Sequence, residues 1–383
     1  MITKIRYSVI LFCALFFFSC SSTKNSASHK NPDSIKNLHF IGQYILPYNL
    51  QYNNTTVGGL SGIDYNPLDN NYYMISDDRS AINPARYYSA QIFLTQKGID
   101  SVKFTGVHYL LQANGNVYPN SKQDPFHTPD PEAMRYNPIT NQFIWSSEGE
   151  RIVKPGELVL ENPAITSIKP GGNYIDTFAL PSNLVMTASE KGPRKNSVLE
   201  GLTFTDNYKN LLVSVEEPLL EDGPNSDVDN GSMTRIMKFD MNTRENVSQY
   251  AYPLDAVAHP AIPKDAYKIN GIPDILSIGD NKMLVIERSY STGRLACTIK
   301  VYLADMSKAT DIKNIYSLQN DKKYVPISKK LLVNMDSLGI YIDNIEGVTF
   351  GPILPNGKHS LIFIADNNFN PLEKMQFLLF EVN

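Results

Sequence analysis

The sequence has little cysteine, and this absence limits how the fold can be held together. It contains three cysteines, of which Cys13 and Cys20 lie in the N-terminal segment, so Cys297 alone remains for the rest of the chain. A disulfide framework is therefore excluded. Cys297 stands within an apolar strand pattern, and we expect it to be a small core residue.

Histidine motifs and an excess of one charge sign are missing too. The six histidines show no metal-ligand spacing, and the sequence has no H-E-x-x-H, no G-x-S-x-G and no phosphate-binding glycine loop. These absences argue against a zinc protease, a serine hydrolase of the elbow type and a nucleotide-binding loop. The net charge of −4 gives no reason to expect nucleic acid as a partner.

The N-terminus has the pattern of an export signal. Lys4 and Arg6 precede the apolar run Ser8–Phe18, which is short for a membrane span, and Phe17-Phe18-Ser19-Cys20 resembles a bacterial lipobox. We therefore predict a signal peptide over residues 1–20, lipidation at Cys20 and a polar tether over residues 21–37. The protein would then be exported and held at the cell envelope by its lipid alone. Phe17 replaces the usual aliphatic residue, so a plain secretory signal is the alternative.

The rest of the chain is organised by a repeat. In Ser197–Glu217 a carboxylate and a small residue open an apolar strand, a polar turn follows, and a second apolar strand ends in acids. The same pattern recurs at Pro131–Glu150 and Ile345–Asp366, with looser copies at Gly59–Asp78 and Ile272–Arg288. The opening acids Glu132, Glu200, Asp274 and Glu346 are 68, 74 and 72 residues apart. A fixed period of strands indicates a repeat architecture.

We predict an all-β fold, a β-propeller of five four-stranded blades forming one domain over residues 38–383. The last unit has only three strands, and the spare strand at Leu38–Pro47 would complete it and close the ring. In the second unit the third strand is expected near Glu157–Leu160. A sixth blade within Asn114–Thr128 or Lys313–Lys330 is the alternative count, and a two-sheet sandwich is the competing class. We expect a monomer.

This topology brings the acids to one mouth of the central channel. The start of each first strand and the end of each second strand lie at the same end, because the two strands are antiparallel. The predicted mouth therefore contains the openers Glu132, Glu200, Asp274 and Glu346, and the closers Asp77, Asp78, Glu148, Glu150, Glu216, Glu217, Glu287 and Asp366.

Such a ring needs neutralising partners. Two carboxylates about 4 Å apart repel by roughly 4 kcal/mol at an effective dielectric constant near 20. Oxygen ligands with few histidines or cysteines favour Ca²⁺ or Mg²⁺ over zinc, and we expect Ca²⁺. Arg79 and Arg288 follow acids of the set and could hold the phosphate of an ester. Alternatively, each acid only accepts backbone hydrogen bonds or pairs with an arginine.

Five blocks, in order, resemble the phytase-like family with esterase-like activity: GLSGIDYNP with YYMISDDRS, DPEAMRYNP with FIWSSEGE, LEGLTF with LLVSVEEPLLEDG, MLVIERSYSTG, and IEGVTFGP with FIADNNFNP. The resemblance covers about Gly58 to Asn383 and implies an exported β-propeller that hydrolyses phosphate or other esters. The positions that match its motifs are Asp77, Asp78, Arg79, Glu132, Glu148, Glu200, Glu216, Glu217, Glu287, Arg288, Glu346, Asp366 and Asn367. Pro273-Asp274 departs from the Glu-Gly or Glu-Ala of the other blocks.

The sequence thus predicts a lipid-anchored hydrolase of small, phosphorylated esters. Its catalytic residues would be Glu132, Glu200, Glu346, Arg79 and Arg288, and its Ca²⁺ ligands Asp77, Asp78, Glu148, Glu216, Glu217, Glu287 and Asp366. Two other functions stay open: a non-catalytic envelope module that binds a ligand or protein at this mouth, and a metal-dependent lactonase or carboxylesterase.

Overall fold

The structure is a computed structural model, and it describes residues 32 and 34–383. The predicted signal peptide, Cys20 and most of the predicted tether lie outside these residues. The packed body begins slightly before the predicted boundary: Ile35 is buried, and the N–H groups of Lys36 and Asn37 donate to the carbonyl of Asn383 at 2.7 and 3.1 Å. Within the described part, no helix is long and apolar enough to cross a membrane.

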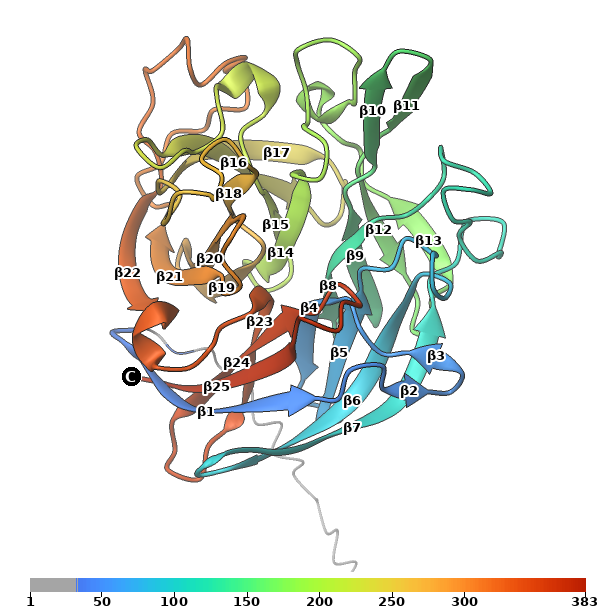
Figure 1. Cartoon of the computed structure of the whole chain (residues 1–383), viewed down its shortest axis with the longest axis vertical. Helices are drawn as coiled ribbons and strands as arrows, with labels where there is room; N and C mark the ends of the chain where they lie inside the picture. The colour runs from blue at the N-terminus through green and yellow to red at the C-terminus, as the bar shows by residue number, and fades with distance from the viewer. Residues whose placement is uncertain (1–31, 33) are drawn as a thin grey trace, which may run out of the picture. The chain divides into compact units, whose positions relative to one another are not determined.

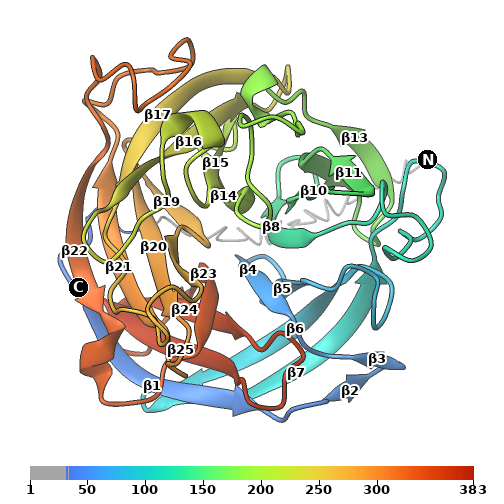
Figure 2. The ribbon, with the colours of Figure 1, turned by 45° about the horizontal axis from the view of Figure 1, so that its top comes forward.

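The described residues form a β-propeller of five antiparallel blades in a ring (Figures 1 and 2). Blade one contains β4 (Leu60–Asn66), β5 (Asn71–Ser76), β6 (Arg86–Thr95) and β7 (Gly98–Tyr109). Blade two contains β8 (Pro131–Asn137), β9 (Gln142–Ser147), β12 (Ala164–Ile168) and β13 (Tyr174–Thr177). Blade three contains β14 (Leu199–Thr205), β15 (Asn210–Val215), β16 (Ser232–Asp240) and β17 (Asn246–Leu254).

Blades four and five depart from this simple order. Blade four contains β18 (Lys268–Gly271), β19 (Ile275–Gly279), β20 (Lys282–Ser291), β21 (Thr298–Asp305) and β22 (Ser328–Asn334). Its innermost strand is broken between β18 and β19 at Pro273, which has no N–H to donate, and both pieces pair with β20. Blade five contains β23 (Asn344–Ile353), β24 (His359–Asp366), β25 (Met375–Val382) and β1 (Leu38–Leu46).

The ring is closed as the sequence predicts, since β1 pairs with β25 from Leu38↔Val382 to Leu46↔Met375. The remaining elements are the short hairpin β2 (Gln51–Tyr52) and β3 (Thr55–Thr56), the hairpin β10 (Glu150–Lys154) and β11 (Glu157–Glu161), and three 3₁₀ turns at Ser182–Leu184, Leu220–Asp222 and Met335–Leu338. Pairing of the first strand with the last blade leaves no free edge at the join.

The third strand of blade two differs from the prediction. Glu157–Leu160 belongs to the hairpin β10–β11, whose residues are mostly exposed or half-buried, and Ala164–Ile168 pairs with β9 instead. The short apolar run of residues 158–160 is typical of any strand, so it cannot distinguish a blade strand from a hairpin that projects from the blade. Within the described residues neither long insert forms a sixth blade.

The core lies between successive blades. Side chains alternate along a strand, so a central strand contacts one neighbouring blade with its odd positions and the other with its even ones. In β15, Leu211 and Val213 pack with Ile144 of blade two, whereas Leu212 packs with Val285 of blade four. This two-sided burial is why the second strand of each repeat is a nearly continuous apolar run.

Candidate active site in the central cavity

The opening glutamates are placed by β-bulges. Glu132, Glu200 and Glu346 each lie where the register between the first and second strand of a blade shifts. A bulge bends the strand and turns its extra residue toward a new direction, here toward the central cavity. The small residue that follows each glutamate has a structural cause as well. A Cβ on Gly201 would lie 2.5 Å from the Cα of Asp274, because neighbouring inner strands meet there.

The cavity at the mouth has a volume of about 490 Å³. The lining carboxylates include Asp343 and Glu373, which the sequence did not predict, and six acids of the predicted mouth from blades one, two, three and five: Asp77, Glu132, Glu148, Glu200, Glu216 and Glu346. The sequence predicts this convergence for all six, three as strand openers and three as residues that follow the second strand. Asp366 is buried at the end of β24, outside the residues that line the cavity, and accepts a hydrogen bond from the N–H of Asn368 at 2.8 Å.

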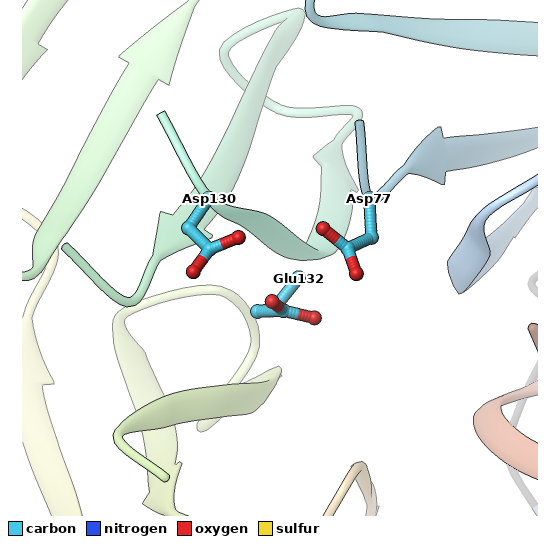
Figure 3. Close-up of side chains that lie close together, drawn as sticks. All are labelled: Asp77, Asp130 and Glu132. Carbon is cyan, nitrogen blue, oxygen red and sulfur yellow. The ribbon is translucent and has the colours of Figure 1, made fainter. Parts of the chain in front are cut away.

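Carboxylate oxygens at the mouth form two adjoining groups. One contains Asp77, Asp130 and Glu132 (Figure 3), and the other contains Glu132, Glu148 and Glu200; within each, one oxygen per residue lies within 4.8 Å of the others. Oxygens spaced in this way can surround one cation with Ca–O distances of about 2.3–2.6 Å. The carboxylates present therefore fit Ca²⁺, and Glu132 belongs to both groups. Sequence reasoning missed Asp130, although it stands two residues before Glu132.

Burial and mutual repulsion make this group of acids hard to ionise. Burial, together with the negative charge of Glu200, raises the pKa of Glu132 well above its ordinary value. Burial and the negative charge of Asp130 raise the pKa of Glu148 well above its ordinary value. Burial and the negative charge of Glu148 raise the pKa of Glu200 in the same way. Burial also raises the pKa of Asp130 to about 6, against the opposing effect of Arg79. A cation or protons must supply the missing positive charge.

Two predicted arginines neutralise part of the set. Arg288 lines the cavity, donates from Nη2 to Glu216 at 2.8 Å, and uses Nη1 for Glu346 and Asn344. Arg79 donates to Asp130 at 3.0 Å and to Glu150 at 3.1 Å. Arg79 is not among the residues that line the cavity and lies behind Asp130, so only Arg288 of the pair faces the open volume.

Three predicted metal ligands, Asp78, Glu217 and Glu287, have other partners. Asp78 accepts from Arg86 at 2.7 Å and from the N–H groups of Ala81, Ile82 and Asn83. Glu217 accepts from Ser197 Oγ at 2.6 Å. None of the three lines the cavity.

Glu287, the third of them, accepts from Tyr252 Oη and from Asn270 Nδ2 at 3.0 and 2.9 Å, and it pairs with Lys329. Because β20 continues to Ser291, Glu287 lies within a strand rather than at its end. Alternation along that strand turns Arg288 to the cavity and Glu287 away from it.

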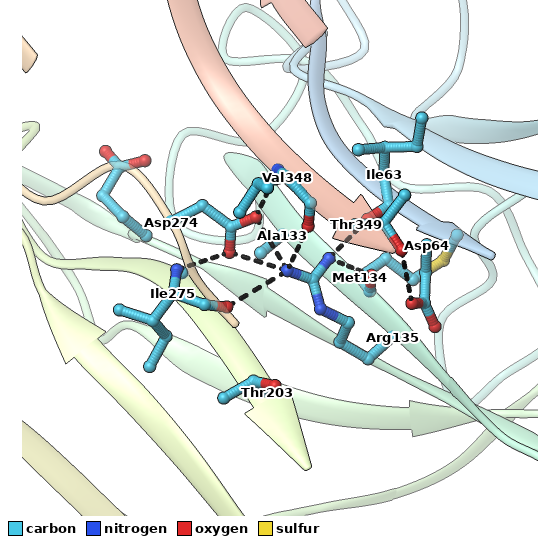
Figure 4. A network of polar contacts seen from close by, with 12 residues as sticks. Ile63, Asp64, Ala133, Met134, Arg135, Thr203, Asp274, Ile275, Val348 and Thr349 are labelled. Atoms are coloured by element: carbon cyan, nitrogen blue, oxygen red, sulfur yellow. Dashed lines mark hydrogen bonds and ion pairs between the residues drawn. The ribbon is translucent and has the colours of Figure 1, made fainter. Parts of the chain in front are cut away.

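Asp274 also differs from its predicted place at the mouth. It is fully buried and accepts two hydrogen bonds from Nη2 of Arg135, at 2.9 and 2.7 Å, and one from the N–H of Val348 at 2.8 Å (Figure 4). The sequence gives no sign of this partner, because the two residues are 139 positions apart. Asp274 thus joins the inner strands instead of lining the cavity.

Comparison with known proteins identifies one family. Residues 55–369 match the family described as Phytase-like, esterase-like activity of phytase. Comparison with curated proteins gives no match.

Among solved structures, the chain is similar to an exo-β-1,3-galactanase from Phanerochaete chrysosporium, with 10% identity over 88% of this chain and 64% of that chain and a TM-score of 0.44. It is also similar to an α-L-arabinofuranosidase from Lactobacillus brevis, with 9% identity, 88% and 92% coverage and a TM-score of 0.42. A xylan β-1,4-xylosidase from Bacillus halodurans C-125 has 8% identity, 92% and 54% coverage and a TM-score of 0.43. Likenesses this distant say nothing of the reaction.

Proposed function

Because this chain belongs to the phytase-like family, we propose that it hydrolyses small phosphate esters in the acidic cavity with the help of Ca²⁺. The observation that carries the proposal is the meeting of Glu132, Glu148 and Glu200 from two blades within 4.8 Å, in a cavity large enough for a small ester. Carboxylates gathered without matching arginines are costly in a structural role, whereas a divalent cation compensates them.

We assign the cation to the two oxygen groups that share Glu132. Asp77, Asp130, Glu148 and Glu200 would hold it together with Glu132, and bound Ca²⁺ would supply Lewis acidity toward a phosphoryl oxygen. Arg79 keeps Asp130 in place through its hydrogen bond at 3.0 Å. This replaces the phosphate-binding role that the sequence predicts for Arg79, because Arg79, unlike Arg288, is not among the residues that line the cavity.

We assign the phosphate to Arg288. Glu216 and Glu346 fix its guanidinium from two sides at the cavity wall, so its charge faces the open volume in a set direction. Prepositioned charge of this kind stabilises a phosphoryl group as it gains negative charge, without reorganisation during the reaction. Glu200 lines the same cavity as Arg288, so the cation that it helps to hold and the arginine would act on one phosphate group.

The test is phosphate release from a panel of esters that includes phenyl phosphate and phytate. It uses residues 21–383 with Ca²⁺ or with EDTA, beside Glu200→Gln and the matched control Glu157→Gln, whose carboxylate lies on the exposed hairpin. We expect Ca²⁺-dependent release that is lost in Glu200→Gln and kept in the control.

Two other results would overturn the phosphoesterase. Hydrolysis of carboxyl esters or lactones alone would assign the site to a carboxylesterase or lactonase. Binding of Ca²⁺ without hydrolysis of any ester would leave a non-catalytic binding module.

We also propose that Cys20 carries a lipid. Strand β1 starts with Leu38, which pairs with Val382, whereas its other end, Leu46, pairs with Met375 beside the cavity loops. The tether therefore joins the propeller at the end of the strands opposite the cavity. Labelling with a radioactive fatty acid in a bacterial host tests the proposal, and labelling of Cys20→Ser equal to that of the unmodified sequence would contradict it.

A further inference from the structure

One wall of the cavity differs in chemistry from its acidic side. Loops of blades four and five contribute Tyr267, Leu295 and Leu372, whose residues are 62%, 81% and 78% exposed, together with the carboxylates Asp343 and Glu373. Tyr290 and Tyr341 stand beside them. Large apolar side chains this exposed in one place indicate a contact surface for something else.

This wall is held in shape by contacts of its own. The ring of Tyr267 lies 6.2 Å from that of Tyr290, and the carbonyl of Tyr267 accepts the N–H of Thr292 at 2.9 Å. Tyr341 donates from Oη to the carbonyl of Leu295 at 2.8 Å, which ties blade five to the loop of blade four. These contacts fix the shape of the wall before any ligand binds.

Arg294 is the exposed cation on the same wall. Among residues 34–383 its guanidinium has no hydrogen-bond or ion-pair partner, in contrast to Arg288, whose two terminal nitrogens are taken by Glu216, Glu346 and Asn344. A polyanion such as phytate carries six phosphate groups and needs several free cations. Arg294, Arg288 at the cavity wall and the apolar side chains match a ligand with a single anionic group, since Asp343 and Glu373 on the same side would repel further anionic groups.

We propose that this wall, formed by Tyr267, Leu295 and Leu372 around Arg294, binds the apolar part of an ester that carries one anionic group. The inference rests on the proposed function and names its substrate class: aryl or alkyl monoesters rather than polyphosphates. The reacting group lies over Arg288 and the carboxylates, and the organic body lies against the wall. A well-placed apolar contact favours the matching substrate by about 10-fold to 200-fold.

The test separates binding from hydrolysis by using phosphonates, which have no ester bond to cleave. Calorimetry with Ca²⁺-loaded residues 21–383 compares phenylphosphonate with methylphosphonate. We expect phenylphosphonate to bind at least about tenfold more tightly, and Tyr267→Ser/Leu295→Ser to abolish that preference. Both side chains are exposed, so the double variant retains its melting temperature.

The matched control is Leu68→Ser/Ile139→Ser. These side chains are 73% and 70% exposed on turns between the first and second strands of blades one and two, at the far end from the cavity. The control should keep the phenyl preference. Arg294→Gln should weaken both phosphonates by a similar factor, because it removes attraction to the anionic group that they share.

The outcomes distinguish this inference from the proposed function. A phenyl preference that is lost in the double variant, with no ester hydrolysed, supports the subsite and overturns the hydrolase. Equal binding of the two phosphonates, or an unchanged preference in the double variant, overturns the subsite even where phosphate esters are hydrolysed. A higher kcat/KM for phytate than for phenyl phosphate would also overturn it.

Discussion

Arg135 of blade two and Asp274 of blade four form an ion pair with two hydrogen bonds, although blade three separates their blades in the ring. The same guanidinium donates to the carbonyls of Ile63 and Val348, in blades one and five. One side chain of blade two thus bonds to the inner strands of three other blades (Figure 4). Arg135 thereby links four of the five blades at the centre of the ring.

We expect Asp274→Asn to lower the free energy of unfolding by about 3–5 kcal/mol, because it leaves the guanidinium of Arg135 buried without its countercharge. Urea unfolding followed by fluorescence measures the change. The matched control is Asp176→Asn, which removes the partner of Arg244 in a pair whose side chains are 29% and 49% exposed and should cost about 1 kcal/mol or less. Equal effects in both variants would contradict a central role for the Arg135 pair.

Glu132 is the carboxylate common to both oxygen groups, so its removal should affect metal binding most. In Glu132→Gln we expect Ca²⁺ to raise the melting temperature much less than in the unmodified protein. In EDTA the same variant should melt at a higher temperature, because one repelling charge has gone. Differential scanning calorimetry measures both, with Glu157→Gln as the control; a variant stabilised by Ca²⁺ as strongly as the control would exclude Glu132 as a ligand.

The metal-free protein should lose stability as the pH rises from about 5 to 8. Burial raises the pKa of Asp130 to about 6 and that of Glu217 to about 7, whereas the same carboxyls in the unfolded chain titrate near 4. Between these values the folded protein still binds protons that the unfolded chain has released, so each increase in pH favours unfolding.

Melting temperatures in EDTA across this range measure the effect, and Ca²⁺ should reduce it by taking the place of the protons. Asp255 does not affect stability between pH 5 and 8, because hydrogen bonds from Lys300, Lys329 and Tyr302 lower its pKa to about 2 against the effect of burial. The stability that its ionised form contributes is lost only at more acid pH. A melting temperature that rises from pH 5 to 8 in EDTA would contradict the predicted titration of the acids.

Closure of the ring predicts different results for two N-terminal truncations. A chain that starts at Ser34 keeps β1 and should fold with an unchanged melting temperature. A chain that starts at Tyr48 lacks β1 and leaves β25 as an open edge, so we expect it to aggregate. Light scattering and calorimetry compare the two, and a monomeric, fully stable chain from Tyr48 would show that β1 is dispensable.

The repeat alone predicts most of the architecture. The 68–74-residue spacing of Glu132, Glu200, Asp274 and Glu346 predicts five blades and the closing role of β1, because both follow from counting strands. It also predicts that Glu132, Glu200 and Glu346 share a mouth with Asp77, Glu148 and Glu216. Antiparallel pairing within each blade is enough to place these six residues, so no long-range contact had to be known.

Partners between blades were decided only by the tertiary structure. Pro273 marks Asp274 as a departure from the repeat, but nothing local shows that Asp274 meets Arg135 at the centre or that Glu287 meets Lys329. Asp130 joins the carboxylate group around Glu132 only because the loop before β8 lies beside Asp77. The sequence by itself determined that six acids reach the mouth, since strand direction is a local property. Which of them remain free for a ligand depended on contacts across the ring, and such contacts form only when the blades pack.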